Sequence, residues 1–137
     1  MSAVSVAMVI LSVEALRESA EDWTAGCFTP AQLDYCRGFR DPLYPLAARF
    51  CAKRAFQLWG WAGEAPAPPA GEVEVLRTPF GPPQLDLRGE ARRLATARHV
   101  KAMHLSLSHC LGYAGALLAV TAGQDKDAGC DGWSSPA

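Results

Sequence analysis

The stretch LYPLAARFCAKRAFQLWG, residues 43–60, predicts the longest helix of the chain. Its apolar residues recur at helical spacing, which places them on one broad stripe that faces a core. They lie at positions 43, 46, 47, 50, 51, 55, 58 and 59. We expect the helix to end at Gly60, because glycine is common just past the C-terminus of a helix.

Three elements are predicted before this helix. Residues 3–11 are apolar and rich in β-branched side chains, which is typical of a buried strand. Residues 13–25 change to helical spacing, with one apolar stripe at Val13, Leu16, Ala20 and Trp23. A further helix is expected from Pro30 to about Arg37, because Thr29 can cap it and proline suits its first position.

The second half of the chain predicts a hairpin, a helix and two strands. Residues 62–71 are rich in alanine and proline and predict a loop. The expected elements are strands at 72–78 and 84–87, a helix at 89–98 and strands at 104–109 and 113–121. Residues 122–137 are polar and show no periodicity, so we expect a domain at 1–121 and a flexible tail at 122–137.

Composition narrows the class of protein. The 137 residues suffice for one domain, and half of them are hydrophobic. The formal net charge of −1 argues against a nucleic-acid partner, whose binding depends on neutralised phosphates. No apolar run approaches the ~20 residues of a membrane helix, so no membrane partner is expected. The five cysteines are scattered, which favours reduced thiols in the cytoplasm over a disulfide framework.

Taken in order, these elements resemble the holo-acyl-carrier-protein synthase family of small phosphopantetheinyl transferases. The resemblance rests on the order and spacing of several short motifs, and it extends from about Val4 to Thr121. The motifs are Phe28-Thr29-Pro30, Gln32-Leu33-x-x-Cys36, Leu46-Ala47-Ala48-Arg49-Phe50-Cys51-Ala52-Lys53, Glu74-Val75-Leu76-Arg77, Gly81-Pro82-Pro83 and HLSLSH at 104–109 followed by Tyr113-Ala114.

The resemblance implies a single α+β domain with the 4′-phosphopantetheinyl transferase fold, a small antiparallel sheet packed on helices. Members of the family move the phosphopantetheine arm of coenzyme A onto a serine of a carrier protein, with Mg²⁺ on the diphosphate. They usually form a homotrimer with active sites between subunits. Coenzyme A, a carrier protein and a homotrimer are therefore the partners that the resemblance implies.

The chain departs from the family at the positions that hold the metal. The family reads Gly-x-Asp in its first strand, where this chain has Ser5-Val6-Ala7. The family reads Lys-Glu-Ala-x-x-Lys in its long helix, where this chain has Arg54 for the Glu and Leu58 for the second Lys. A methyl group and a guanidinium offer no oxygen to Mg²⁺. We therefore expect no Mg²⁺ and no efficient Mg²⁺-dependent transfer.

The residues that remain define the predicted site. His104 is the candidate for proton transfer, because an imidazole titrates near neutral pH. Arg54 is the candidate electrophilic clamp, with a solvated head group at a disused site as the alternative. The predicted ligand-binding residues are Ala7, Arg49, Lys53, Leu58, Pro82, Ser106 and Ser108, although the two serines are also explained by hydrogen bonds to local backbone.

Three functions fit these residues. The preferred hypothesis is a repurposed biosynthetic enzyme, in which His104 and Arg54 assist a proton transfer, cyclisation or dehydration of an apolar, polyketide-like intermediate. The first alternative is a non-catalytic protein that binds a carrier protein or another enzyme. The second is a residual holo-acyl-carrier-protein synthase that uses coenzyme A.

Overall fold

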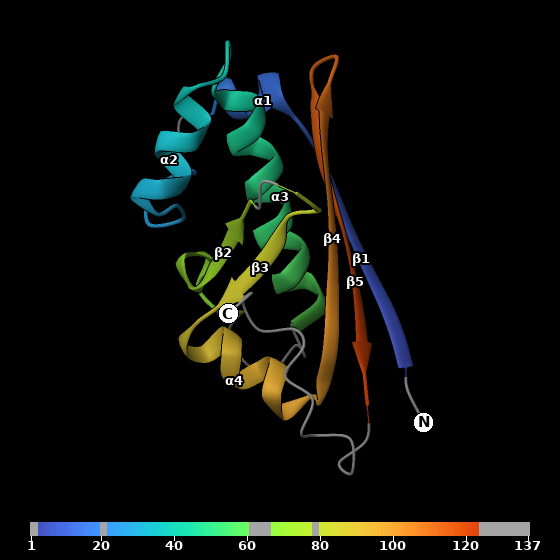
Figure 1. Cartoon of the computed structure of the whole chain (residues 1–137). Helices are drawn as coiled ribbons and strands as arrows, with labels where there is room; N and C mark the ends of the chain where they lie inside the picture. Colours follow the sequence, from blue (N-terminus) through green and yellow to red (C-terminus); the bar gives the residue numbers. More distant parts are fainter. Residues whose placement is uncertain (1–2, 20–21, 61–66, 78–79, 124–137) are drawn as a thin grey trace.

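A three-stranded antiparallel sheet and a two-stranded hairpin lie on different sides of the longest helix (Figure 1). The computed structural model describes residues 3–19, 22–60, 67–77 and 80–123. The larger sheet has the order β1-β5-β4, with β1 at Ala3–Ser12, β4 at Val100–Cys110 and β5 at Tyr113–Ala122. The hairpin pairs β2 (Val73–Leu76) with β3 (Gln84–Leu87).

The helices are α1 (Val13–Arg17), α2 (Pro30–Arg37), α3 (Leu43–Gly60) and α4 (Gly89–Ala97), with a short 3₁₀ turn at Ala70–Glu72. The α+β architecture predicted from the sequence is confirmed.

Helix α3 is the centre of the core. It turns small side chains toward the larger sheet, and small side chains let a helix approach a sheet closely. These residues are Ala47, Ala48, Cys51, Ala52 and Ala55, all at most 1 % exposed. They share one hydrophobic cluster with Leu105, Ala116 and Leu118 of the sheet and with Val73 and Leu85 of the hairpin. The helix predicted from the apolar stripe is confirmed, and Gly60 is its last residue.

Strand β1 has one covered face and one exposed face. It pairs with β5 along all 10 of its residues. Ala7, Val9 and Leu11 pack against the core, while Val4, Val6, Met8 and Ile10 are 60–70 % exposed. The prediction of a buried strand is therefore correct for one face only, because the helices cover a single side of the sheet.

The helix predicted over residues 13–25 ends at Arg17. Local hydrogen bonds compete with the helix beyond that point, since both the backbone N–H and the Oγ1 hydroxyl of Thr24 donate to Asp22 Oδ1. The apolar position Trp23 still packs inward, with its Nε1 donating to the Leu16 carbonyl at 3.2 Å and its ring beside Phe50. The predicted inward positions Val13, Leu16 and Trp23 are thus confirmed, the helical conformation beyond Arg17 is wrong, and Ala20 lies outside the described residues.

Helix α2 has the predicted limits because the residues that cap it lie next to its first residue in the sequence. The Thr29 hydroxyl accepts from the Gln32 backbone N–H at 3.2 Å, and the Gln32 side-chain oxygen accepts from the Thr29 N–H at 3.2 Å. This reciprocal pair satisfies two N–H groups that a helix start leaves free. The Thr29 hydroxyl also donates to Glu74 Oε2 of β2, which ties the helix start to the hairpin.

Helix α4 has a cap supplied from a distant segment. Its own N-cap residue, Arg88, makes no side-chain capping bond. Instead, Glu72 Oε1 accepts from the Ala91 backbone N–H at 3.1 Å. The Arg88 N–H donates to the Glu72 carbonyl at 2.9 Å, so one residue of the 3₁₀ turn contacts both sides of the helix start.

The last strands are longer than predicted. Strand β4 begins at Val100 rather than His104, and β5 includes Ala122, the residue assigned to the start of the tail. The Gly123 N–H donates to the His99 carbonyl at 2.8 Å, so hydrogen bonding to the domain continues to Gly123. The remainder of the predicted tail, 124–137, and residues 62–66 of the predicted loop at 62–71 lie outside the described residues.

Replacing Thr29 with alanine tests the cap. We expect Thr29→Ala to lower the free energy of unfolding by about 1–2 kcal/mol, because it removes the N-cap acceptor and the bond to Glu74 together. Urea unfolding followed by circular dichroism measures this change. Thr96→Ala is the matched control, since Thr96 is an exposed residue within α4, and its effect should stay within about 0.5 kcal/mol. Equal effects of the two substitutions would contradict the role of the cap.

Candidate functional site

A polar stripe runs along β4 on the outer face of the larger sheet. His104, Ser106 and Ser108 are exposed and alternate with Leu105 and Leu107, which face the core. The sheet register places this stripe beside an apolar surface, since His104 lies opposite Ala119 and Ser106 lies opposite Leu117. The prediction that these three polar residues share one face follows from strand alternation and agrees with the register.

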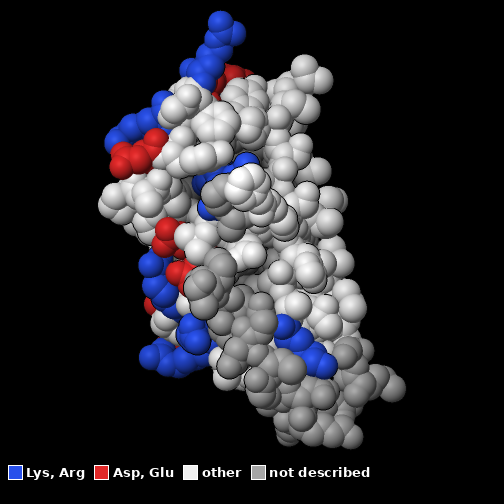
Figure 2. Space-filling view, in the orientation of Figure 1, with Lys and Arg blue, Asp and Glu red and all other residues white. Residues whose placement is uncertain are grey.

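The rest of the outer face is mostly apolar. Its exposed residues on β1 and β5 are Val4, Val6, Met8, Ile10, Tyr113 and Leu117, which are 41–70 % exposed. Charged side chains gather over the helices and the hairpin in Figure 2, whereas the side formed by the larger sheet is largely white. A continuous apolar surface of this kind marks a contact surface, because isolated domains rarely leave one open to water.

Lys53 is a buried cation that holds α3 to the hairpin side of the fold. Its side chain is fully buried, and its Nζ donates to the carbonyls of Ala70, at 3.1 Å, and of Val73. The ammonium also lies 5.4 Å from the centre of the Phe28 ring. Burial lowers the pKa of Lys53 to about 8, because desolvation disfavours the charged form.

The three cations of α3 occupy three different surroundings. Arg49 is only 4 % exposed, and its Nη1 donates to the Pro45 carbonyl at 3.0 Å. Arg54 is exposed, one helical step away from the buried Lys53. Because successive helical residues point about 100° apart, Arg54 points away from Arg49 and Lys53, which lie four residues apart on one side of the helix.

His104 and Arg54 lie on different sides of the larger sheet within one chain. The His104 side chain is on the outer face, while α3, which carries Arg54, packs on the inner face. Ala7 is half-buried on that inner face opposite Leu118, and Leu58 is 56 % exposed on α3. Pro82 is exposed just before β3. No single-chain site therefore joins the two predicted catalytic residues.

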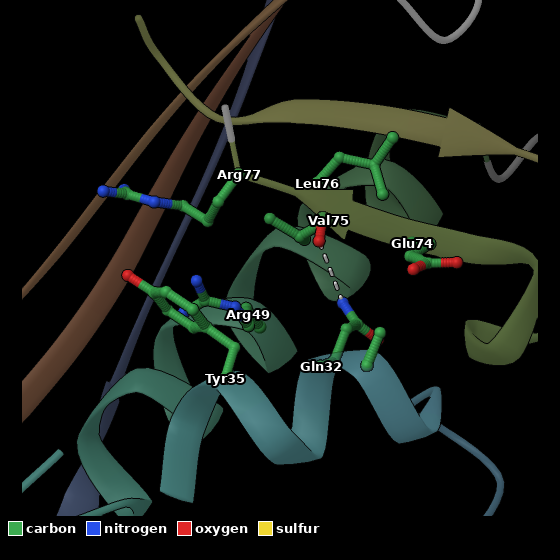
Figure 3. A pocket seen from close by; sticks show the side chains of 8 residues that line it. Gln32, Tyr35, Arg49, Glu74, Val75, Leu76 and Arg77 are labelled. Carbon is green, nitrogen blue, oxygen red and sulfur yellow. Dashed lines mark hydrogen bonds between the residues drawn. The ribbon is translucent and has the colours of Figure 1, made fainter. Parts of the chain in front are cut away.

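A pocket of about 210 Å³ lies between α2, α3 and β2 (Figure 3). Arg49 and Arg77 lie at one end of it near the Tyr35 ring, and Glu74 lies at the other. Gln32 Nε2 donates to the Val75 carbonyl at 3.4 Å and so joins α2 to β2 across the pocket. Of the predicted ligand-binding residues, only Arg49 lines this pocket. Sequence reasoning missed Arg77, because nothing in the local pattern shows that the end of β2 lies beside α2.

The donor set does not suit magnesium. Neither β1 nor α3, the elements in which the resemblance implies metal ligands, contains an Asp or a Glu. This holds for whichever residue of β1 is aligned with the family's aspartate. Among the described residues, no group of three or more His, Cys, Asp or Glu side chains is placed to bind a metal ion. Mg²⁺ requires hard oxygen ligands, and these two elements supply none from a carboxylate.

Comparison with known proteins shows the class of protein. The chain is 36% identical over 91 residues to a holo-[acyl-carrier-protein] synthase of Syntrophus aciditrophicus, an alignment that covers 66% of this chain and 71% of the relative. It is 40% identical over 92 residues to a holo-[acyl-carrier-protein] synthase of Dehalococcoides mccartyi, covering 66% of this chain and 72% of that one. It is also 33% identical over 98 residues to fatty acid synthase subunit alpha of Schizosaccharomyces pombe, covering 71% of this chain and 5% of that one. No family model matches the chain.

Solved structures agree with these relatives. The apo-ACPS structure from Chronobacterium ammoniagenes has a TM-score of 0.75 at 25% identity, and the match covers 90% of this chain and 100% of that one. The ACPS–CoA complex from the same organism has a TM-score of 0.72 at 25% identity, covering 89% and 99%. The chain belongs to the holo-acyl-carrier-protein synthase family. These proteins support the transferase, which the sequence analysis held as an alternative, and none of them supports a repurposed cyclase or dehydratase.

The described residues contain no helix that is both long and apolar enough to cross a membrane.

The burial of Lys53 predicts a pH dependence of stability. The unfolded chain has a lysine pKa near 10.5 and the folded chain one of about 8, so between these values the unfolded state binds more protons. Stability therefore rises with pH across this window. We expect the free energy of unfolding of the native chain, minus that of Lys53→Met, to increase by roughly 2–3 kcal/mol from pH 7.5 to pH 10.5. Urea unfolding at several pH values measures the difference, and a difference independent of pH would contradict the burial of the charged group.

Proposed function

We propose that this chain is a residual holo-acyl-carrier-protein synthase, which transfers phosphopantetheine from coenzyme A to a serine of a carrier protein slowly and without Mg²⁺. Membership of the family is the observation that carries the proposal. The retained polar stripe of His104, Ser106 and Ser108 on an exposed strand supports it, because such a stripe is open to a large substrate.

The chemistry assigns a distinct task to each predicted catalytic residue. The serine oxygen of the carrier attacks the β-phosphorus of coenzyme A, the bond to the α-phosphate oxygen breaks, and 3′,5′-ADP leaves. His104 accepts the serine proton as general base. Arg54 offsets the negative charge of the diphosphate, since a guanidinium binds phosphate oxygens through two parallel hydrogen bonds. A guanidinium replaces only part of the charge of a dication, so the transfer is slow.

The separation of His104 from Arg54 within one chain supports an active site shared between subunits. We propose a homotrimer in which the outer sheet face of one subunit covers the neighbouring subunit. Burial of Val4, Val6, Met8 and Ile10 in such contacts would remove the exposed apolar surface from water. His104 of one subunit would then meet Arg54 of the next, beside Leu58 and Ala7.

A second candidate is the repurposed enzyme, and one observation favours it. Neither β1 nor α3 carries a carboxylate, and the exposed Leu58 stands where the family has a lysine. A site with these side chains suits an apolar intermediate better than a highly charged nucleotide. A non-catalytic protein that binds a carrier is the remaining outcome if neither reaction takes place.

Incubation with coenzyme A and an apo-acyl carrier protein tests the proposal. Intact-mass spectrometry should show the carrier gaining one phosphopantetheine, at a rate that excess EDTA changes by less than about twofold. His104→Gln should lower the rate by about a hundredfold or more, because it removes the general base. His109→Gln is the control on the same strand, since that ring packs on the inner side against Tyr44 and Phe39. A requirement for Mg²⁺ would overturn the metal-free site, and an unmodified carrier would overturn the transferase and leave the second candidate.

Mixing two inactive variants tests the shared site. His104→Gln and Arg54→Gln each disable one half of the proposed site, so each alone should be inactive. Unfolding and refolding them together in equal amounts should restore about one quarter of the native rate, because a quarter of the randomly formed interfaces then hold both intact residues. Size-exclusion chromatography with light scattering gives the mass of the assembly. A monomeric mass, or no recovered activity, would contradict the shared site.

A further inference from the structure

We propose that the pocket between α2, α3 and β2 is a binding site for a small carboxylic acid with an apolar body, and that Arg49 and Arg77 hold its carboxylate. This pocket contains neither predicted catalytic residue, and of the predicted ligand-binding residues it contains Arg49 alone, so failure of the transferase reaction would leave this proposal standing.

Arg49 is a buried charge that forms no ion pair with the described residues. Its side chain is 4 % exposed, yet the hydrogen bond from Nη1 to the Pro45 carbonyl is the one bond that joins its guanidinium to the described part of the chain. None of the ion pairs within residues 3–19, 22–60, 67–77 and 80–123 includes Arg49 or Arg77. A buried, unpaired charge is unfavourable, so an anion that enters the pocket gains a partner that is already desolvated.

Arg49 and Arg77 converge on one aromatic ring. The central carbon of the Arg49 guanidinium lies 4.7 Å from the centre of the Tyr35 ring, and that of Arg77 lies 5.9 Å from it. Figure 3 shows Arg77 reaching from the end of β2 toward the side of the pocket where Tyr35 and Arg49 lie. Stacking on a ring fixes the plane of a guanidinium while leaving its N–H groups at the edge available to a carboxylate.

The rest of the pocket selects the class of anion. Ala31, Val75 and Leu76 contribute apolar walls, and a cavity of about 150 Å³ is already large enough for a benzene ring. At the far end, Glu74 is held by Arg88 at 3.0 Å and by the Thr29 hydroxyl at 3.2 Å. Its negative charge disfavours a phosphate dianion more than a carboxylate. A monoanion with one ring or a short alkyl chain therefore fits both the charges and the size.

Titration with simple acids tests this proposal. The probes are benzoate and hexanoate, their neutral amides benzamide and hexanamide, and inorganic phosphate, each added to the full-length protein. Backbone NMR shifts around Tyr35 and Val75 report binding at this pocket. We expect benzoate or hexanoate to bind with a Kd below about 1 mM, its amide at least about tenfold more weakly, and phosphate more weakly than the acid.

Arginine variants distinguish binding of the acid in the pocket from nonspecific electrostatic attraction of anions to the protein. Arg77→Gln should weaken binding of the acid at least about fivefold, and Arg49→Lys should weaken it because a lysine cannot form two parallel bonds to a carboxylate. Arg93→Gln is the matched control, since it removes one exposed positive charge on α4, and it should leave the affinity within about twofold. Because Arg77 is exposed, we expect Arg77→Gln to fold, so this variant tests the proposal even if Arg49→Lys does not fold.

Four results would overturn the proposal. They are equal affinity for acid and amide, equal effects of Arg77→Gln and Arg93→Gln, tighter binding of phosphate than of either acid, and no shift at this pocket with about 10 mM acid.

Discussion

Burial of α3 on nearly every side is the constraint on which the rest of the structure depends. One face of this helix lies against the larger sheet through alanine and cysteine side chains, and other faces meet β2 and the 3₁₀ turn. Away from the exposed side that carries Arg54 and Leu58, long polar side chains of this helix do not reach solvent. Lys53 therefore donates to backbone carbonyls, and Arg49 donates to one carbonyl and lies against an aromatic ring. The surroundings of these cations follow from the burial of the helix.

Features that depend on local chemistry were predictable from the sequence. The start of helix α2 was predictable because the capping residue Thr29 directly precedes Pro30, and its end agrees with the expected position near Arg37. The β2–β3 hairpin followed from alternation of apolar residues. The predicted helix at 13–25 was wrong beyond Arg17, because Asp22 and Thr24 form local hydrogen bonds with each other. Hydrophobic spacing alone does not report that competition.

The candidate site was predictable in part for the same reason. Alternation along β4 correctly grouped His104, Ser106 and Ser108, because the period of a strand is fixed by its geometry. Sequence spacing could separate the directions of Lys53 and Arg54, but it could not show which distant carbonyls would receive the ammonium. The pocket beside Tyr35 depends on the meeting of α2 with β2, residues about 40 positions apart in the chain, and long-range contacts of that kind have no local signature.

The cap of α4 affects how the start of this helix unfolds locally. Glu72 stabilises the first turn of α4 from outside the helix, through both its carboxylate and its backbone carbonyl. Gly89 has a φ of 55°, which suits glycine, and a Cβ added there would lie 2.2 Å from Glu72 Oε2, so the Glu72 carboxylate would have to move away. The 3₁₀ turn and the helix start are thus fitted to each other and should fluctuate as one unit, so the amide of Ala91 exchanges with solvent when Glu72 withdraws rather than when the helix frays by itself.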